Sequence, residues 1–216
     1  MAITINGSGT ITGVSAGGLP DGSVTADDLA STLDLGSKTL TIPTNTTGLP
    51  SGGLSNAELW RLAVDRSHNN GEIIGINSGE WEAYDDGNPG SLGSSMSVST
   101  TGSESTGGQF TFPSTGIWYV LFHGYARIFD TNDYYGVHIE STYNNGTNWD
   151  TASQNLTSAY STGYYMNITA QFIFDCTNTS THRIRFKAVE AGGYVKFEGN
   201  TNIGLTTALF MKLGET

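Results

Sequence analysis

Apolar and polar residues alternate along most of the second part of the chain, which is the pattern of half-buried β-strands. In residues 182–189, for example, Ile184, Phe186 and Ala188 alternate with basic residues. Residues 134–143 follow the same period, whereas residues 117–122 form a continuous apolar run that predicts a strand buried on both faces. Further strand-like segments, joined by Gly- and Asn-rich turns, occupy residues 107–116, 164–174, 194–197 and 206–214. Seven or more short strands of this kind predict an all-β sandwich.

Residues 55–66 fit two different structures. Ser55 and Glu58 have the spacing of a helix capping box, which favours a helix. Trp60, Leu62 and Val64, however, occur at every second position, which favours a strand. Local propensity alone leaves both alternatives open.

The front of the chain differs sharply from the rest. The first 59 residues contain no Phe, Tyr or Trp, and all 23 aromatic residues follow, beginning with Trp60. Residues 2–12 alternate Ile with Thr as a strand does, residues 24–36 predict a short helix, and residues 38–42 predict another strand. Because aromatic side chains dominate most cores, this segment buries too little to fold alone. We expect copies of itself or a larger assembly to order it; the alternative is packing on its own globular domain.

Three stretches together resemble a known family. Residues 110–120 and 206–214 resemble strands of the complement-type, tumour-necrosis-factor-like globular head. Residues 59–64 resemble the first strand of versions of this head found at the C-termini of bacteriophage fibre proteins, and this match favours a strand at residues 55–66. Residues 18–35 are similar to amino-terminal segments of tail-fibre-like phage proteins.

The resemblance implies a ten-stranded jelly roll that assembles as a tight homotrimer, with aromatic and aliphatic residues packed along the threefold axis. Members of the family are binding modules rather than enzymes. Some bind calcium, but no matching ligand motif occurs here, and we expect no metal and no cofactor. The expected fold is therefore all-β: a C-terminal jelly-roll sandwich (residues 56–216) preceded by an extended N-terminal segment of short strands and one short helix (residues 1–55).

Charge, hydropathy and cysteine content restrict the classes of binding partner and the role of the cysteine. The net charge is −11, and the chain has no basic patch of the kind that binds phosphate backbones, so we expect no nucleic acid partner. It also has no apolar run long enough for a membrane span, and we expect no secretory signal and no membrane insertion. Cys176 is the single cysteine and lies in a strand-like run, which predicts a small buried apolar residue.

The sequence offers little for catalysis. Its four histidines show none of the spacings typical of a metal site, and no Gly-x-Ser-x-Gly elbow occurs. Adjacent Asp85 and Asp86 lie in a turn-rich stretch, which predicts a solvated turn rather than the separated carboxylate pair of a glycosidase. We therefore expect that the protein is not an enzyme.

Two polar loops are candidates for ligand recognition, because each places aromatic rings beside Asn and Asp side chains. Sugars are often bound by such residues, and binding sites tend to lie on loops of a rigid scaffold. The alternative, in which Tyr143 and Trp149 pack at a sheet edge or a trimer seam, stays open. The candidate residues are Asp130, Asp133, Tyr134, Tyr135, Asn144, Asn148, Trp149 and Asp150.

Together these features predict a bacteriophage virion protein that is assembled in the host cytoplasm. We expect a trimeric tail fibre or appendage that docks to other virion proteins through residues 1–55 and binds a host surface glycan through its knob. One alternative is a capsid decoration or head-fibre protein that stabilises the shell. Another is a bacterial carbohydrate-binding adhesin, which requires an export route that the sequence does not show. A polysaccharide-cleaving enzyme is a further alternative, for which we expect no cleavage.

Overall fold

The computed structural model describes residues 4–5, 11–12, 54–85, 90–129, 134–158 and 161–216. The chain divides into two units, Met1–Pro50 and Ser51–Thr216. In the first unit β1 (Thr4–Ile5) pairs with β2 (Ile11–Thr12) in antiparallel fashion, which agrees with the strand period of residues 2–12. The helix expected at residues 24–36 and the strand expected at residues 38–42 lie outside the described residues.

The second unit is built from two antiparallel sheets, and the part of the chain that the structure describes contains no helix. The larger sheet has the order β4-β14-β9-β15-β3-β5, with β12 paired to β9 and β6 paired to β3. Its strands are β3 (Ala57–Leu62), β4 (Arg66–His68), β5 (Trp81–Ala83), β6 (Ser91–Leu92), β9 (Gly116–Ile128), β12 (Tyr165–Cys176), β14 (Val195–Phe197) and β15 (Thr207–Gly214). The smaller sheet has the order β11-β10-β13-β8-β7. Its strands are β7 (Ser97–Val98), β8 (Phe110–Thr111), β10 (Tyr134–Thr142), β11 (Asp150–Ser158) and β13 (Arg183–Glu190).

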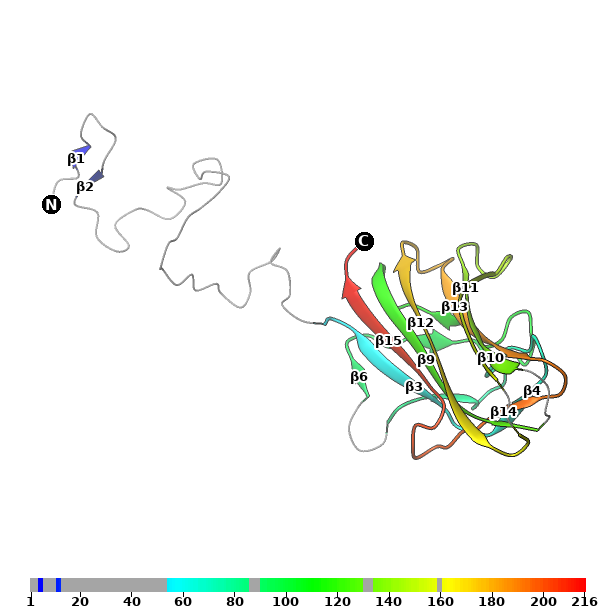
Figure 1. Cartoon of the computed structure of the whole chain (residues 1–216). Coiled ribbons are helices and arrows are strands. Elements are labelled where there is room, and N and C mark those ends of the chain that lie inside the picture. The colour runs from blue at the N-terminus through cyan, green and yellow to red at the C-terminus, as the bar shows by residue number, and fades with distance from the viewer. Residues whose placement is uncertain (1–3, 6–10, 13–53, 86–89, 130–133, 159–160) are drawn as a thin grey trace. The chain divides into compact units, whose positions relative to one another are not determined.

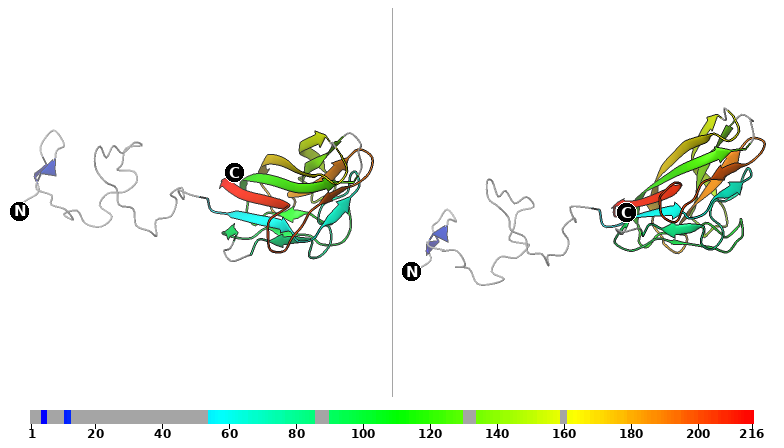
Figure 2. Two further views of the ribbon diagram at one scale, coloured as in Figure 1. Left: turned by 60° about the horizontal axis from the view of Figure 1, so that its bottom comes forward. Right: turned by 90° about the horizontal axis from the view of Figure 1, so that it is seen from below.

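The two sheets stack face to face and enclose an aromatic core (Figure 1; Figure 2). Phe110 lies near its centre, with ring centroids 5.5 Å from Trp81, 5.7 Å from Phe186 and 4.9 Å from Phe210. These rings come from both sheets, so the core joins segments that are far apart in the sequence. Cys176 is a buried free thiol, as the sequence predicts, and burial raises its pKa.

Residues 57–62 form a strand, so the helix alternative for residues 55–66 is wrong. β3 pairs with β15 over five residues and with β5 on its other side. Trp60, whose side chain is half-buried, packs edge-to-face on Phe110 with ring centroids 5.5 Å apart. Pairing on both sides gives the backbone groups of this segment inter-strand partners, which outweighs the local capping signal.

β9 departs from its prediction in an informative way. The apolar run at residues 117–122 predicts burial on both faces, but the thirteen residues of β9 alternate between buried and half-buried. Trp118, Val120 and Phe122 point into the core, whereas Tyr119 and Leu121 lie on the opposite face and stay half-buried. The prediction that this strand is buried on both faces is therefore wrong for the single chain, because only one face of the larger sheet packs on the core.

Candidate functional site

The first predicted loop contributes one accessible residue to the described structure. Asp130 and Asp133 lie outside the described residues. Tyr134 begins β10 and is 41% exposed, whereas Tyr135 is buried in the core. Burial raises the pKa of the Tyr135 hydroxyl to about 12. Tyr135 therefore belongs to the packing of the sandwich and not to an accessible surface.

The second predicted loop, residues 143–150, is held largely by its own hydrogen bonds. The side-chain oxygen of Asn144 accepts from the Thr142 hydroxyl at 2.8 Å and from the Asn148 backbone N–H at 3.0 Å. Asn145 has a φ of 57°, and its backbone N–H donates to the Thr181 carbonyl at 2.8 Å. The loop is thus built as a compact turn, and the Asn144 carbonyl oxygen is already engaged.

Trp149 has one ring face covered from within the chain. The guanidinium carbon of Arg185 lies 4.1 Å from the centre of the Trp149 ring, which is cation–π geometry. The indole nitrogen of Trp149 is buried and has no hydrogen-bond partner among the described residues. Asp150 is exposed at the start of β11, opposite Ser141. Sugar stacking on this loop stays a prediction, and only the remaining face of Trp149 is left for it.

The two loops lie at opposite ends of β10. This strand has nine residues, so at about 3.3 Å per residue its ends are roughly 27 Å apart. The structure therefore brings Asn144, Asn148, Trp149 and Asp150 together and separates them from Tyr134. This division agrees with the strand predicted at residues 134–143, which separates the two loops in the sequence.

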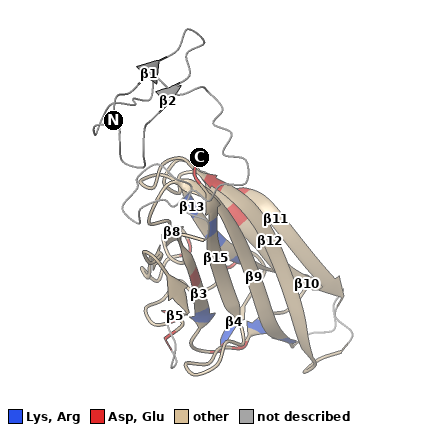
Figure 3. Ribbon diagram, turned by 90° about the vertical axis from the view of Figure 1, so that its left-hand side faces the viewer, with Lys and Arg blue, Asp and Glu red and all other residues tan. Residues whose placement is uncertain are grey.

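Sequence reasoning missed the outer face of the larger sheet, by which we mean the side chains of β12, β9, β15 and β3 that point away from the core. The strand register aligns two rows across these four strands. The rows are Ile173-Tyr119-Met211-Ala57 and Gln171-Leu121-Leu209-Leu59. Figure 3 shows the four strands side by side with few charged residues along them.

The outer face of the larger sheet stays accessible in the single chain. Ile173 is 59% exposed, and the side chains of Tyr119, Leu121, Leu209 and Met211 are half-buried. Tyr119, Gln171, Phe172 and Ile173 line a hollow of about 290 Å³. The Tyr119 hydroxyl donates to the Gln171 side chain at 2.7 Å, which fixes the tyrosine ring in this hollow. A contiguous apolar face of this kind is typical of a protein–protein contact.

Arg61 lies on the same face, one row further along, and is almost fully buried. Its guanidinium donates to Glu82 at 2.9 Å and to Asp85 at 2.8 Å, and it lies 4.8 Å from the centre of the Tyr84 ring. Asp85 is thus an ion-pair partner and not only part of a solvated turn, whereas Asp86 lies outside the described residues.

His138 and His182 have structural surroundings. His138 points away from the core between buried Val137 and Ile139, as their alternation predicts. The His182 ring is within 3.0 Å of the Thr177 and Thr181 hydroxyls. Among the described residues, no three His, Cys, Asp or Glu side chains are placed to hold one metal ion. Within the same residues, no helix has the length and apolar character needed to span a membrane.

Comparison with known proteins shows a similarity in fold but no family membership. No family model and no curated protein matches this sequence. Among solved structures, the Eiger TNF of S. frugiperda is similar over 74% of this chain and 93% of its own, with a TM-score of 0.51 and 13% identity. Murine APRIL is similar over 73% of this chain and 98% of its own, with a TM-score of 0.48 and 14% identity. At 13% identity the likeness to the Eiger TNF concerns architecture alone, and the chain therefore has the tumour-necrosis-factor-like jelly-roll fold.

Proposed function

We propose that this protein is a homotrimeric structural component of a bacteriophage virion, a tail fibre or appendage whose jelly-roll head meets the host surface. The observation that carries the trimer is the outer face of the larger sheet. Two aligned rows of mainly apolar side chains run across β12, β9, β15 and β3 without being fully covered in one chain. Removing apolar surface from water is worth about 25 cal/mol per Å². Packing these faces against one another therefore contributes to the stability of the assembled state.

The virion assignment is supported by the sequence resemblance of residues 59–64 and 18–35 to phage fibre proteins. The aromatic-free front segment is suited to docking on other virion proteins, because it has too few bulky apolar residues to fold on its own. The head acts as a binding module for a surface glycan and carries out no chemistry. Three identical heads on one shaft raise the avidity for a repeating surface without requiring tight binding at any single site.

The host-binding role is tested with the purified full-length protein. Added before infection, it is expected to adsorb to host cells and to reduce phage adsorption in a concentration-dependent way. Enzymatic removal of the surface polysaccharide should abolish both effects. Unchanged adsorption of the phage in the presence of saturating protein would contradict host binding.

The position in the virion is tested separately. Gold-labelled antibodies raised against the head are expected to decorate an appendage of the tail. Decoration of the capsid surface would instead support a shell-stabilising protein. Absence of label from intact virions would overturn the virion assignment itself.

A further inference from the structure

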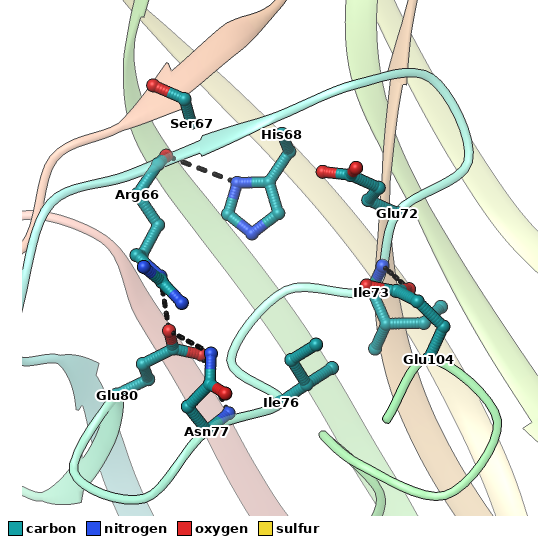
Figure 4. Close-up of a pocket in the computed structure, with 9 residues that line it drawn as sticks. All are labelled: Arg66, Ser67, His68, Glu72, Ile73, Ile76, Asn77, Glu80 and Glu104. Atoms are coloured by element: carbon teal, nitrogen blue, oxygen red, sulfur yellow. Dashed lines mark hydrogen bonds and ion pairs between the residues drawn. The ribbon is translucent and has the colours of Figure 1, made fainter. Parts of the chain in front are cut away.

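A polar cavity of about 180 Å³ lies between the strand β4 and the loop that follows it (Figure 4). It is separate from the outer face of the larger sheet and from the two predicted loops. It is lined by Arg66, Ser67, His68, Glu72, Ile73, Ile76, Asn77, Glu80 and Glu104. A volume of this size accommodates about six water molecules, or one small organic molecule. In Figure 1, β4 lies at the end of the sandwich away from the C-terminus.

The wall of the cavity is fixed to the core. The Ile74 backbone N–H donates to the Phe186 carbonyl of β13 at 2.9 Å, and Ile73 forms a β-bridge with Lys187. Gly75 has a φ of 79°, and a side-chain carbon at this position would overlap the Trp81 indole. The indole nitrogen of Trp81 donates to the Ile74 carbonyl at 3.0 Å. The conformation of this loop is therefore stabilised by its contacts with β13 and Trp81.

Three carboxylates around the cavity are held by donors of the protein. Glu72 accepts from the backbone and the side chain of Asn69 at 2.9 and 2.8 Å. Glu80, which is buried, accepts from the backbone and the side chain of Asn77 at 2.9 and 2.7 Å and pairs with Arg66. Glu104 accepts from the Ile73 backbone N–H at 2.6 Å. Each carboxylate oxygen has two lone pairs, so these groups are fixed in position and still able to accept.

His68 adds a fourth acceptor from inside the wall. It is only 5% exposed, and its Nδ1 lies 3.1 Å from the Arg66 carbonyl, which can only accept, so Nδ1 carries the proton. Burial lowers the pKa of His68, against opposing contributions from Glu72 and Glu80, and keeps the ring neutral near pH 7. Its Nε2 is then an unprotonated acceptor that has no partner among the described residues, and in Figure 4 it points into the cavity.

The charge of the cavity selects its occupant. Three carboxylates face a single guanidinium, so the site has an excess of negative charge and of hydrogen-bond acceptors. The described His, Cys, Asp and Glu side chains do not converge on a single metal position here, which favours a larger cation. We propose that this cavity binds a small organic molecule that carries a protonated primary amine together with hydroxyl groups. The ammonium pairs with the carboxylates, and Ile73 and Ile76 contact its carbon skeleton.

The proposal is tested by titrating the full-length protein with glucosamine and glucose, which share a ring and differ in an ammonium or hydroxyl group at one carbon. Isothermal titration calorimetry is expected to show saturable binding of glucosamine and at least about tenfold weaker binding of glucose, because a charge-assisted hydrogen bond is lost. In protein labelled with ¹⁵N-histidine, the His68 Nε2 resonance should shift along the same binding curve. No saturable glucosamine binding, or equal affinity for both sugars, would overturn the proposal.

A matched pair of variants tests the location. Glu104→Gln keeps an oxygen that accepts from the Ile73 N–H but removes the charge, and should weaken glucosamine binding about tenfold. Glu215→Gln makes the same change at an exposed residue paired with Lys212, and should leave the affinity unchanged. Equal affinities of the two variants would show that glucosamine binds elsewhere. Tighter binding of magnesium chloride than of glucosamine at the same ionic strength would identify the cavity as a metal site and overturn the assignment to an organic cation.

Discussion

The outward side chains of the two sheets differ in their chemistry. On the smaller sheet, the outward side chains are polar, and the charged ones on β10 and β13 find partners within the chain. Buried Glu140 of β10 accepts from Arg185 at 2.7 Å and also pairs with Lys187, both on the neighbouring strand β13. On the larger sheet, the outward side chains form apolar rows with few charges.

This difference indicates which face is exposed to solvent and which face contacts another subunit. The charged side chains of the smaller sheet find partners inside one subunit, and the excess of basic groups over Glu140 suits this face to solvent. Exposure of the apolar rows of the larger sheet to water is unfavourable. These rows are therefore suited to packing against the same surface of a second and a third subunit. Alternation alone identifies the face that points into the core, but the chemistry of the opposite face distinguishes solvent from a partner.

The largest expected effect follows from a charge placed in the apolar rows. Leu121→Arg changes a half-buried side chain in the middle of β9, next to Gln171 and Leu209. A single chain tolerates the new charge because it reaches solvent, whereas a trimer would have to bury it unpaired. We expect the variant to be folded by circular dichroism and monomeric by light scattering.

The control carries the same change on the other sheet. Gln154→Arg alters an exposed residue of β11 opposite His138 and should leave the trimer intact. Dissociation of both variants, or of neither, would remove the distinction between the two faces.

Removing the charged centre of the smaller sheet should affect stability and leave assembly unchanged. Glu140→Ala leaves Arg185 and Lys187 without their shared carboxylate, and both are largely buried. We expect a loss of about 3 kcal/mol in the free energy of unfolding, at the lower end of the range for breaking a buried pair, because Lys187 is partly exposed. Denaturant unfolding measures this loss, and a change in the oligomeric mass of the folded variant would contradict the assignment.

Stability should also fall in mild acid. Burial lowers the pKa of His68 below its usual value, so the unfolded chain takes up the proton more readily than the folded one. The stabilisation is present above about pH 6.5 and is lost as the pH falls towards the lower folded pKa, at about 1.4 kcal/mol per unit of pKa lowering. Thermal unfolding across this range should show a smaller decrease for His68→Gln than for the native protein. An identical decrease would contradict the role of His68.

The smallest expected effect concerns Tyr135. Its hydroxyl is buried and has no hydrogen-bond partner among the described residues. Tyr135→Phe removes a polar group that is costly to bury and should stabilise the head by about 1 kcal/mol. Host-cell adsorption should not change. A destabilised variant would show that the hydroxyl has a partner in solution.

Much of the sandwich follows from sequence periodicity. The alternation of Ile184, Phe186 and Ala188 predicted the core face of β13, and the spacing of Trp60 and Leu62 favoured the strand β3. Even the misplacement of Tyr135 was avoidable, because it shares its parity with Val137 and Ile139, and all three are buried.

The sites were harder to predict for a physical reason. The cavity beside His68 combines β4 and the loop after it with Glu104, which lies more than thirty residues further along the chain and reaches the loop through its hydrogen bond with the Ile73 N–H. The outer face of the larger sheet depends on the register of four strands that are dispersed along the sequence. The apolar run at residues 117–122 did carry a signal, because a strand apolar on both faces within a sheet covered on one side requires a further layer.

The mass of the full-length protein in dilute solution tests the central claim most directly. Analytical ultracentrifugation or light scattering at micromolar concentration should give three times the 22.9 kDa mass of the chain. The same measurement on Leu121→Arg should give the mass of one chain. A well-folded native protein that sediments as a single chain would contradict the account of the larger sheet and, with it, the trimeric fibre.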